Sequence, residues 1–252
     1  MLKPRVIPVL LLRNHGLVKT LKFDKHIYVG DPINAIKIFN EKEVDELVFL
    51  DIDASKNDAS PNFEMISQIA TECFMPVCYG GGIKNIDSIR KILKLGIEKV
   101  AINNAAINSL DFIKYAVKIF GSSTIVVSID IKKNFFGKPQ LYDHTKMKTI
   151  EYDLFEYIAK IEKCGVGEIL INSVDRDGTM SGYDISLIKT ITKQVNIPVV
   201  VCGGASSLSN IKLAVIEGGA SAAAAGSLFV LNGKHKAVLI TYPNSNDLYQ
   251  LF

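Results

Sequence analysis

Two stretches of the chain repeat each other, with Pro76 and Pro198 lying 122 positions apart. The segment PVCYGGGIKNIDSIRKILKLG, from Pro76 to Gly96, matches PVVVCGGASSLSNIKLAVIEGG, from Pro198 to Gly219. Each runs from a proline through a short apolar segment to a glycine pair and ends on another glycine. The same spacing aligns Glu46–Ser55 with Glu168–Asp177. A repeat of this length predicts a chain made of two fused halves of one architecture.

Short apolar runs recur along the chain and alternate with segments of helical periodicity. Apolar runs without polar alternation are typical of parallel strands that are covered on both faces. In DPINAIKIFNEK, Asp31 is the expected N-cap and Pro32 the first helical residue, and NIDSIRKILKLG is a second helical segment that stops at Gly96. Eight strand–helix units in 252 residues predict a single (β/α)8 TIM barrel, built from two repeated half-barrels and spanning residues 1–252. The expected strands are Arg5–Leu12, Glu46–Ile52, Pro76–Tyr79, Lys99–Asn103, Thr124–Ile131, Glu168–Ser173, Pro198–Cys202 and Ala220–Ala225.

Charge and cysteine usage predict a cytoplasmic protein that binds neither nucleic acid nor a membrane. The net charge is +3, and the charged residues are spread without blocks. The four cysteines have no metal-ligand spacing, which fits a reducing compartment. The apolar run after Arg5 is interrupted by Pro8 and has no cleavage site behind it, so we interpret it as a strand. No apolar stretch reaches the roughly 20 residues that span a bilayer.

Glycine turns follow the third and the seventh expected strand. In a barrel of this kind, ligands bind at the carboxyl ends of the strands. YGGGI and CGGAS would let backbone N–H groups approach an anion, and INNAA and AAGSLF follow the neighbouring strands. Repetition of the turns predicts two phosphate sites on opposite sides of the mouth, although glycine turns are also common as tight loops. We therefore expect a phosphorylated small molecule as the ligand.

Carboxylates also gather at the expected strand ends. Asp51 and Asp53 close the second strand, Asp130 ends the otherwise apolar fifth strand, and Asp175 and Asp177 follow the sixth. Such groups transfer protons, bind hydroxyl groups or hold metals, but loop caps and turns also use aspartate. Lys19, after the first strand, is positioned to cover a bound anion or to be simply exposed. We find no serine or histidine triad, P-loop, metal motif or cofactor motif, and assign no role to the four histidines.

Four charged residues lie at the beginnings of strands instead. They belong to the first, second, fourth and sixth strands, so they would meet at the bottom of the barrel. Two are positive and two negative, which predicts a ring of salt bridges, with separate exposed charges as the alternative. The residues are Arg5, Glu46, Lys99 and Glu168.

Motifs along nearly the whole chain, from Met1 to about Phe229, resemble the HisF family, the cyclase subunit of imidazole glycerol phosphate synthase. They include DELVFLDI, GGGI, VVSID, CGGA and, most specifically, DRDGTMSGYD. The resemblance implies a (β/α)8 barrel that works with a separate glutaminase of the HisH type. Ammonia from that subunit would enter through a charged gate at the barrel bottom and react at the mouth with a bisphosphorylated ribonucleotide.

The resemblance also implies roles for individual positions. The gate corresponds to the four strand-start charges. One phosphate site corresponds to Gly82, Asn103 and Asn104, and the other to Asp177, Gly178, Gly204, Gly226 and Ser227. Of two catalytic aspartates in the family, one matches Asp130, and the other falls where this chain has Leu11.

Leu11 separates the functional alternatives. A leucine carries no proton, and losing one general acid or base typically costs about 10²–10⁴ in rate. The segments IPVLLL, GLVKT and VGDPINA resemble a divergent HisF-like branch that is associated with amidation of surface-polysaccharide sugars, where a glutaminase and an amidotransferase convert an acetamido group to an acetamidino group. An ammonia-relaying barrel in such a system is the first hypothesis. The alternatives are a histidine-pathway cyclase in which Asp51, Asp53 or a water replaces the carboxylate, and a non-catalytic scaffold that binds a phosphorylated ligand.

Overall fold

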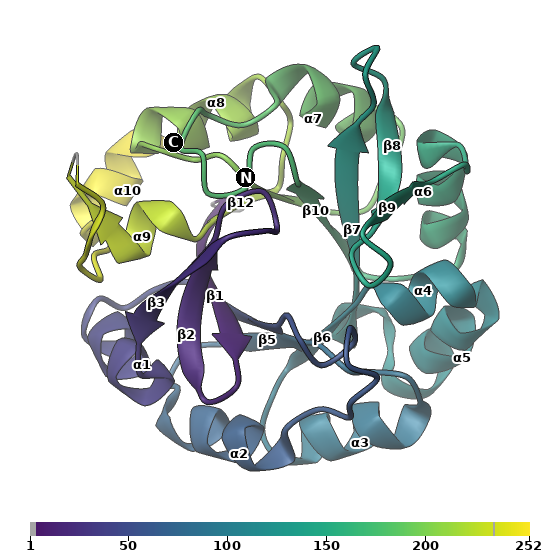
Figure 1. Ribbon diagram of the computed structural model, residues 1–252, viewed down its shortest axis with the longest axis horizontal. Coiled ribbons are helices and arrows are strands. Elements are labelled where there is room, and N and C mark those ends of the chain that lie inside the picture. Colours follow the sequence, from purple (N-terminus) through teal and green to yellow (C-terminus); the bar gives the residue numbers. More distant parts are fainter. Residues whose placement is uncertain (1–3, 234) are drawn as a thin grey trace.

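Eight parallel strands close into a barrel in the computed structural model, which describes residues 4–233 and 235–252 (Figure 1). The first barrel strand pairs with both the second and the last, and the sixth pairs with both the fifth and the seventh, so the ring is continuous. The predicted TIM barrel is confirmed, and all eight expected strands are present. The barrel strands are β1 (Arg5–Arg13), β4 (Leu47–Asp51), β5 (Val77–Gly80), β6 (Lys99–Ile102), β7 (Ile125–Lys133), β10 (Glu168–Ser173), β11 (Val199–Cys202) and β12 (Ala222–Ala225).

Helices surround the barrel, and both expected helices are present. Asp31 caps the first by accepting a hydrogen bond from Asn34 N at 2.8 Å, and Asn85 caps the third by accepting one from Ser88 N at 2.8 Å. Apolar side chains on the inner helix faces pack against the strands, and this packing stabilises the outer layer. The helices are α1 (Pro32–Glu41), α2 (Phe63–Glu72), α3 (Ile86–Lys94), α4 (Asn104–Asn108), α5 (Leu110–Phe120), α6 (Leu154–Lys163), α7 (Ile185–Thr192) and α8 (Leu208–Ile216), with a 3-10 turn at Ser122–Thr124.

Two antiparallel extensions that the sequence patterns did not predict follow β1 and β7, the first strands of the two halves. After β1 the chain adds β2 (Gly16–Thr20) and β3 (His26–Gly30); after β7 it adds β8 (Pro139–Asp143) and β9 (Lys148–Ile150). Figure 1 shows them on opposite sides of the barrel opening. The two halves therefore share an insertion point as well as the strand–helix pattern.

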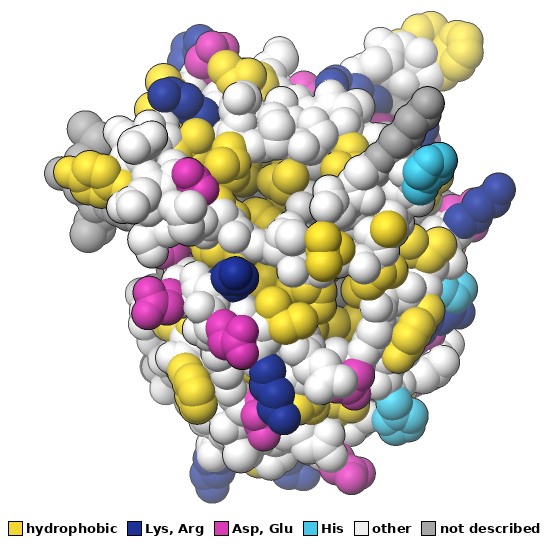
Figure 2. All heavy atoms as spheres, turned by 90° about the vertical axis from the view of Figure 1, so that its left-hand side faces the viewer, with side chains coloured by type: hydrophobic (Ala, Val, Ile, Leu, Met, Phe, Trp, Pro, Cys, Tyr) yellow, Lys and Arg dark blue, Asp and Glu magenta, His cyan; other side chains and the backbone are white. Residues whose placement is uncertain are grey.

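The C-terminal segment covers the outside of the barrel between α8 and α1 (Figure 1). It comprises α9 (Ser227–Val230), β13 (Leu231–Asn232), β14 (Ala237–Val238) and α10 (Ser245–Leu251). Tyr242 anchors it, since its hydroxyl donates to Val6 O at 2.8 Å and its ring lies 5.3 Å from that of Phe229. Figure 2 shows this side of the molecule, where apolar side chains gather toward the middle and charged side chains surround them.

The apolar core has two layers. The larger lies between the strands and the helices. The smaller fills the barrel interior with small and branched side chains, namely Ile7, Val9, Leu11, Val18, Val48, Cys78, Ala101, Val126, Leu170, Val200, Ala222 and Ala224. None of the described helices combines the length and the apolar content needed to cross a bilayer. Residues 1–3 and 234, which the predicted domain 1–252 includes, lie outside the described residues.

Candidate functional site

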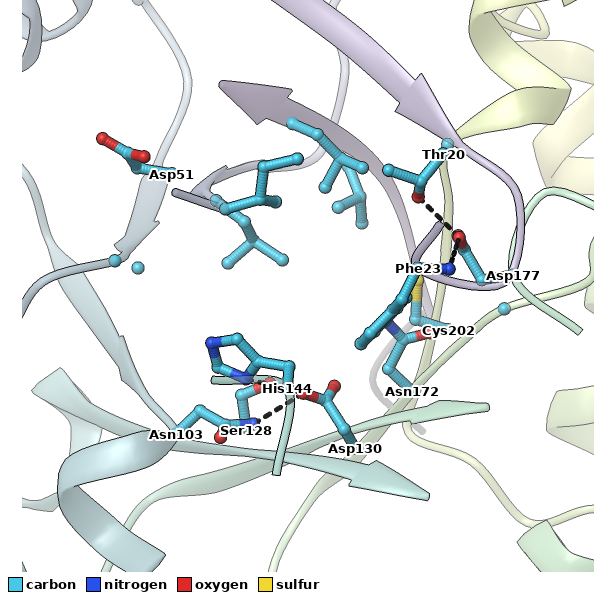
Figure 3. Close-up of a pocket in the computed structure, with 18 of the residues that line it drawn as sticks. Thr20, Phe23, Asp51, Asn103, Ser128, Asp130, His144, Asn172, Asp177 and Cys202 are labelled. Carbon is cyan, nitrogen blue, oxygen red and sulfur yellow. Dashed lines mark hydrogen bonds and ion pairs between the residues drawn. The ribbon is translucent and has the colours of Figure 1, made fainter. Parts of the chain in front are cut away.

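A cavity of about 190 Å³ lies at the carboxyl ends of the barrel strands (Figure 3). It brings together residues that are far apart in the sequence, as ligand sites of α/β barrels do. Of the residues singled out from the sequence, the following line it: Leu11, Lys19, Asp51, Asp53, Asn103, Asn104, Asp130, Asp177, Gly178, Gly204, Gly226 and Ser227.

Leu11 and Asp130 stand on opposite sides of this cavity, because β1 and β7 are four strands apart in the closed ring. Leu11 lies beside Val18 of β2 and Leu50 of β4 in the strand register, and it belongs to the apolar interior. Asp130 is buried and accepts a hydrogen bond from Asn103 Nδ2 at 3.0 Å. One wall of the site is therefore apolar where the other carries an ionisable group.

His144, to which the sequence assigned no role, lies beside Asp130 in the cavity (Figure 3). Its Nδ1 is 3.3 Å from Asp130 Oδ2, an ion-pair distance without hydrogen-bond alignment. Burial alone lowers the pKa of His144, but contact with Asp130 and the charges of Asp130 and Asp143 outweigh burial, so that the pKa lies above its usual value. Sequence patterns missed this residue because it reaches the site from the unpredicted turn between β8 and β9.

Lys19 does not stand free over the cavity. Its Nζ donates to Asp177 Oδ1 at 2.8 Å, and both side chains are buried. Thr20 Oγ1 donates to Asp177 Oδ2 at 2.5 Å, and the backbone N–H of Phe23 approaches the same oxygen at 3.4 Å. Asp177 thereby ties the β2–β3 extension to the loop after β10 at one edge of the cavity (Figure 3).

The glycine turns differ in how they meet the cavity. Gly204 has a φ of +108° and lines it, and the position requires glycine because a side chain there would meet the backbone of Gly182. Gly82, with a φ of +69°, is not among the lining residues, and its N–H donates to Ser55 Oγ at 3.1 Å. The expected anion contact at Gly82 is therefore taken by a side chain of the protein itself in this structure.

Three of the candidate carboxylates make structural contacts. Asp51 accepts from the N–H groups of Asp53 and Ala54, at 3.2 and 3.0 Å, and burial raises its pKa. Asp53 pairs with Arg13, and Asp175 accepts from Lys133 N at 2.7 Å. These are the cap and loop roles that the sequence left open as the alternative.

Three residues that line the cavity have a buried polar atom without a partner in the described part of the chain. Asn103 Oδ1, Asn172 Oδ1 and Ser227 Oγ have no hydrogen-bond partner in the described structure, and all three residues line the cavity. An unpaired buried polar atom is costly, so these atoms are suited to a bound ligand. Asn172 and Cys202 were not singled out from the sequence. Burial raises the pKa of the Cys202 thiol to about 12, which argues against a thiolate nucleophile at neutral pH.

The four strand-start charges meet at the opposite end of the barrel. Arg5 pairs with both Glu46 and Glu168. Lys99 Nζ lies 3.0 Å from Glu46 Oε2 and 3.4 Å from Glu168 Oε2. Each cation contacts both anions, so the four side chains form a closed ring below the apolar interior.

The family model for "Histidine biosynthesis protein" matches residues 5–236. The chain belongs to this family. It is 50% identical over 248 residues to a protein of Pseudomonas aeruginosa, a match that covers 98% of this chain and 99% of the relative. Relatives from Leptospira borgpetersenii (48%, 100% of both chains) and Vibrio vulnificus (46%, 98% and 95%) are similar along their whole length as well. Each of the three is named a putative imidazole glycerol phosphate synthase subunit, hisF2, HisF and hisF3 respectively.

Membership of the histidine biosynthesis family agrees with the architecture. The resemblance read from the sequence ended at about Phe229. The family model extends seven residues further and ends inside the C-terminal segment. The relatives' numbered subunit names indicate paralogues of one HisF-like protein.

Proposed function

We propose that the chain is the synthase subunit of a glutamine-dependent amidotransferase, which receives ammonia from a HisH-type glutaminase at the barrel bottom and directs it to amidation of a surface-polysaccharide sugar. In this reaction an acetamido group becomes an acetamidino group, and a separate amidotransferase takes part. The proposal rests on one combination of features: a closed ring of charged side chains at the bottom of the barrel, and a leucine at position 11 at its mouth.

The ring supports ammonia delivery. Arg5, Glu46, Lys99 and Glu168 close the barrel bottom, and a docked partner could open it by displacing one ion pair. Above the ring the interior is apolar, with alanine at three of its positions. Neutral ammonia enters such surroundings far more readily than the ammonium ion, because burying an unpaired charge is costly.

Leu11 supports a reaction other than histidine biosynthesis. A cyclase that uses two aspartates on opposite strands would find only Asp130 here. Asp51 Oδ1 accepts from two loop N–H groups and Asp53 pairs with Arg13, so both carboxylates already have structural contacts. The sugar acceptor itself rests on the sequence resemblance to the divergent branch.

The second candidate is the cyclase of histidine biosynthesis. Asp130, Lys19 and Gly204 all line the cavity, and the relatives carry the name of that synthase. A scaffold that only binds a phosphorylated ligand and a partner is a third candidate, which the unpaired buried atoms of the cavity also suit.

Reconstitution tests these candidates. The full chain is co-purified with candidate glutaminases, and the complex is given glutamine, the amidotransferase and an acetamido sugar, with the histidine-pathway ribonucleotide in a parallel reaction. Mass spectrometry should show exchange of an oxygen for an NH group on the sugar. Product from the ribonucleotide alone would favour the cyclase of histidine biosynthesis. Absence of product from both substrates would favour the non-catalytic scaffold.

A further inference from the structure

We propose that His144 and Asp130 are the proton-transfer pair of the mouth, so that the barrel performs covalent chemistry on arriving ammonia and does not only conduct it. The inference rests on the proposed function in one respect, the presence of ammonia at the mouth. It does not depend on which glutaminase supplies it.

The geometry places both groups on one side of the cavity. Asp130 belongs to β7, and His144 follows β8, the strand that pairs with the end of β7. Their side chains approach to 3.3 Å, and both line the cavity (Figure 3). The carboxylate in turn accepts from Asn103 Nδ2, which orients it. A histidine beside a buried carboxylate is a common arrangement for proton transfer.

Several hydrogen bonds stabilise the turn that carries His144. Asp143 is fully buried, and its Oδ1 accepts from Thr145 N at 2.9 Å, Thr145 Oγ1 at 2.6 Å and Lys146 N at 3.2 Å. Asn104 Nδ2 donates to Thr145 Oγ1 at 3.2 Å and ties the turn to the start of α4. These contacts fix the turn on both sides of His144, and such support is what a preorganised site requires.

The charges around His144 determine when it carries a proton. Asp130 from β7 and Asp143 from β8 favour the imidazolium, and Lys56 from the loop after β4 disfavours it. Lys146, in the same turn, is paired with Asp143 at 3.2 Å. Asp130 and Asp143 outweigh burial and Lys56, so the pKa of His144 lies above its usual value.

The step that this pair would catalyse is addition of ammonia to a carbonyl carbon of a phosphorylated ligand. The nitrogen lone pair forms the C–N bond, and the π pair of the carbonyl moves onto its oxygen. The imidazolium of His144 gives a proton to that oxygen, and the neutral imidazole then takes a proton from the new nitrogen. Asp130 stabilises the imidazolium, so one group performs both transfers without a second carboxylate at position 11.

The test uses the full chain with ammonium chloride as the nitrogen source and the histidine-pathway ribonucleotide as the probe. His144→Gln removes the titrating group, Asp130→Asn removes its partner, and His15→Gln changes an exposed histidine outside the cavity. We expect His144→Gln to lower kcat by about 10²–10⁴ with little change in KM, while His15→Gln matches the wild type.

NMR titration of the histidine side chains separates chemistry from structure. We expect the pKa of His144 to fall in Asp130→Asn, and the pH dependence of kcat to shift with it. Retention of kcat within about threefold in a folded His144→Gln variant, or wild-type turnover no faster than that of a variant carrying both His144→Gln and Asp130→Asn, would overturn the proposal. Because ammonium is supplied directly, failure of glutamine-dependent delivery shows separately, as turnover with ammonium but not with glutamine.

Discussion

Lys19 Nζ donates to Asp177 Oδ1 at 2.8 Å across 158 residues of chain, and both side chains are buried. The two residues were expected to contact a ligand phosphate, but in this structure they bind each other. Lys19 also lies against Gly226, whose missing side chain leaves room for it. An anion that contacted Lys19 would share the lysine with Asp177, so we expect ligand binding to weaken the contact that ties the β2–β3 extension to Asp177.

Replacing Lys19 with methionine should loosen that extension. Asp177 would keep the hydroxyl of Thr20 but lose its counter-charge, and breaking a buried ion pair typically costs about 3–5 kcal/mol in free energy of unfolding. Urea denaturation measures the loss, and hydrogen exchange at Phe23 N–H should speed up. Lys25→Met, at an exposed position of the same extension, is the control. Equal stability of the two variants would contradict a structural role for the pair.

Replacing Glu46 with alanine should uncouple the barrel from its glutaminase. Arg5 and Lys99 would share one remaining carboxylate, and because they are 28% and 22% exposed we expect only about 2 kcal/mol of destabilisation. Glutamine-dependent product should fall, whereas turnover with ammonium chloride should not. Glu64→Ala, an exposed change in the first turn of α2, controls for charge. Unchanged glutamine-dependent turnover in Glu46→Ala would contradict the proposal that the charge ring is the ammonia gate.

The purified barrel should be a poor cyclase. With ammonia and the histidine-pathway ribonucleotide, we expect turnover at least about a hundredfold slower than that of a two-aspartate cyclase, since Leu11 offers no proton and the single imidazole of His144 must perform both transfers in turn. Steady-state kinetics of both proteins under the same conditions give the comparison. A normal cyclase rate would favour the histidine-biosynthesis candidate.

Phosphate should occupy the mouth near Gly204–Ser227 and, after Ser55 releases the N–H of Gly82, near Gly82–Asn103. Ser227 lines the cavity, and its buried Oγ has no hydrogen-bond partner among the described residues. Ser227→Ala should weaken phosphate binding by about 1 kcal/mol, the net value of a typical hydrogen bond, and calorimetry measures it. Ser60→Ala, at an exposed position, should bind as the wild type does. Crystals grown in phosphate with both turns empty would argue against these sites.

The contact between His144 and Asp130 should make stability depend on pH. The folded pKa of His144 is raised, so its stabilisation is complete below the unfolded value of about 6.5 and is lost as the pH rises through the folded value. The difference in free energy of unfolding between wild type and His144→Gln should therefore be larger at about pH 6 than at about pH 9. Urea denaturation at the two pH values measures it. His15→Gln should show no such trend, and a larger difference at the higher pH would contradict the assignment.

The strand and helix positions were predictable because their signals are local. Apolar runs without alternation indicated the eight barrel strands, and caps such as Asp31 and Asn85 lie next to the helices they start. The extensions after β1 and β7 escaped prediction because short strands that protrude from the barrel carry mixed polar and apolar residues. Those extensions carry both Lys19 and the turn with His144, so the missed elements are also the ones that complete the site.

The sequence by itself determined the repeat, the barrel and the identity of the residues at each strand end, including leucine at position 11. Only the tertiary structure decided which of those residues touch. Closure of the barrel joins Arg5 and Lys99 to Glu46 and Glu168, and the folding of the two extensions beside the mouth pairs Lys19 with Asp177 and brings His144 to Asp130. The physical reason is that periodicity and capping depend on residues close together in the sequence. These contacts instead depend on strand register and on loops that meet residues distant in the chain.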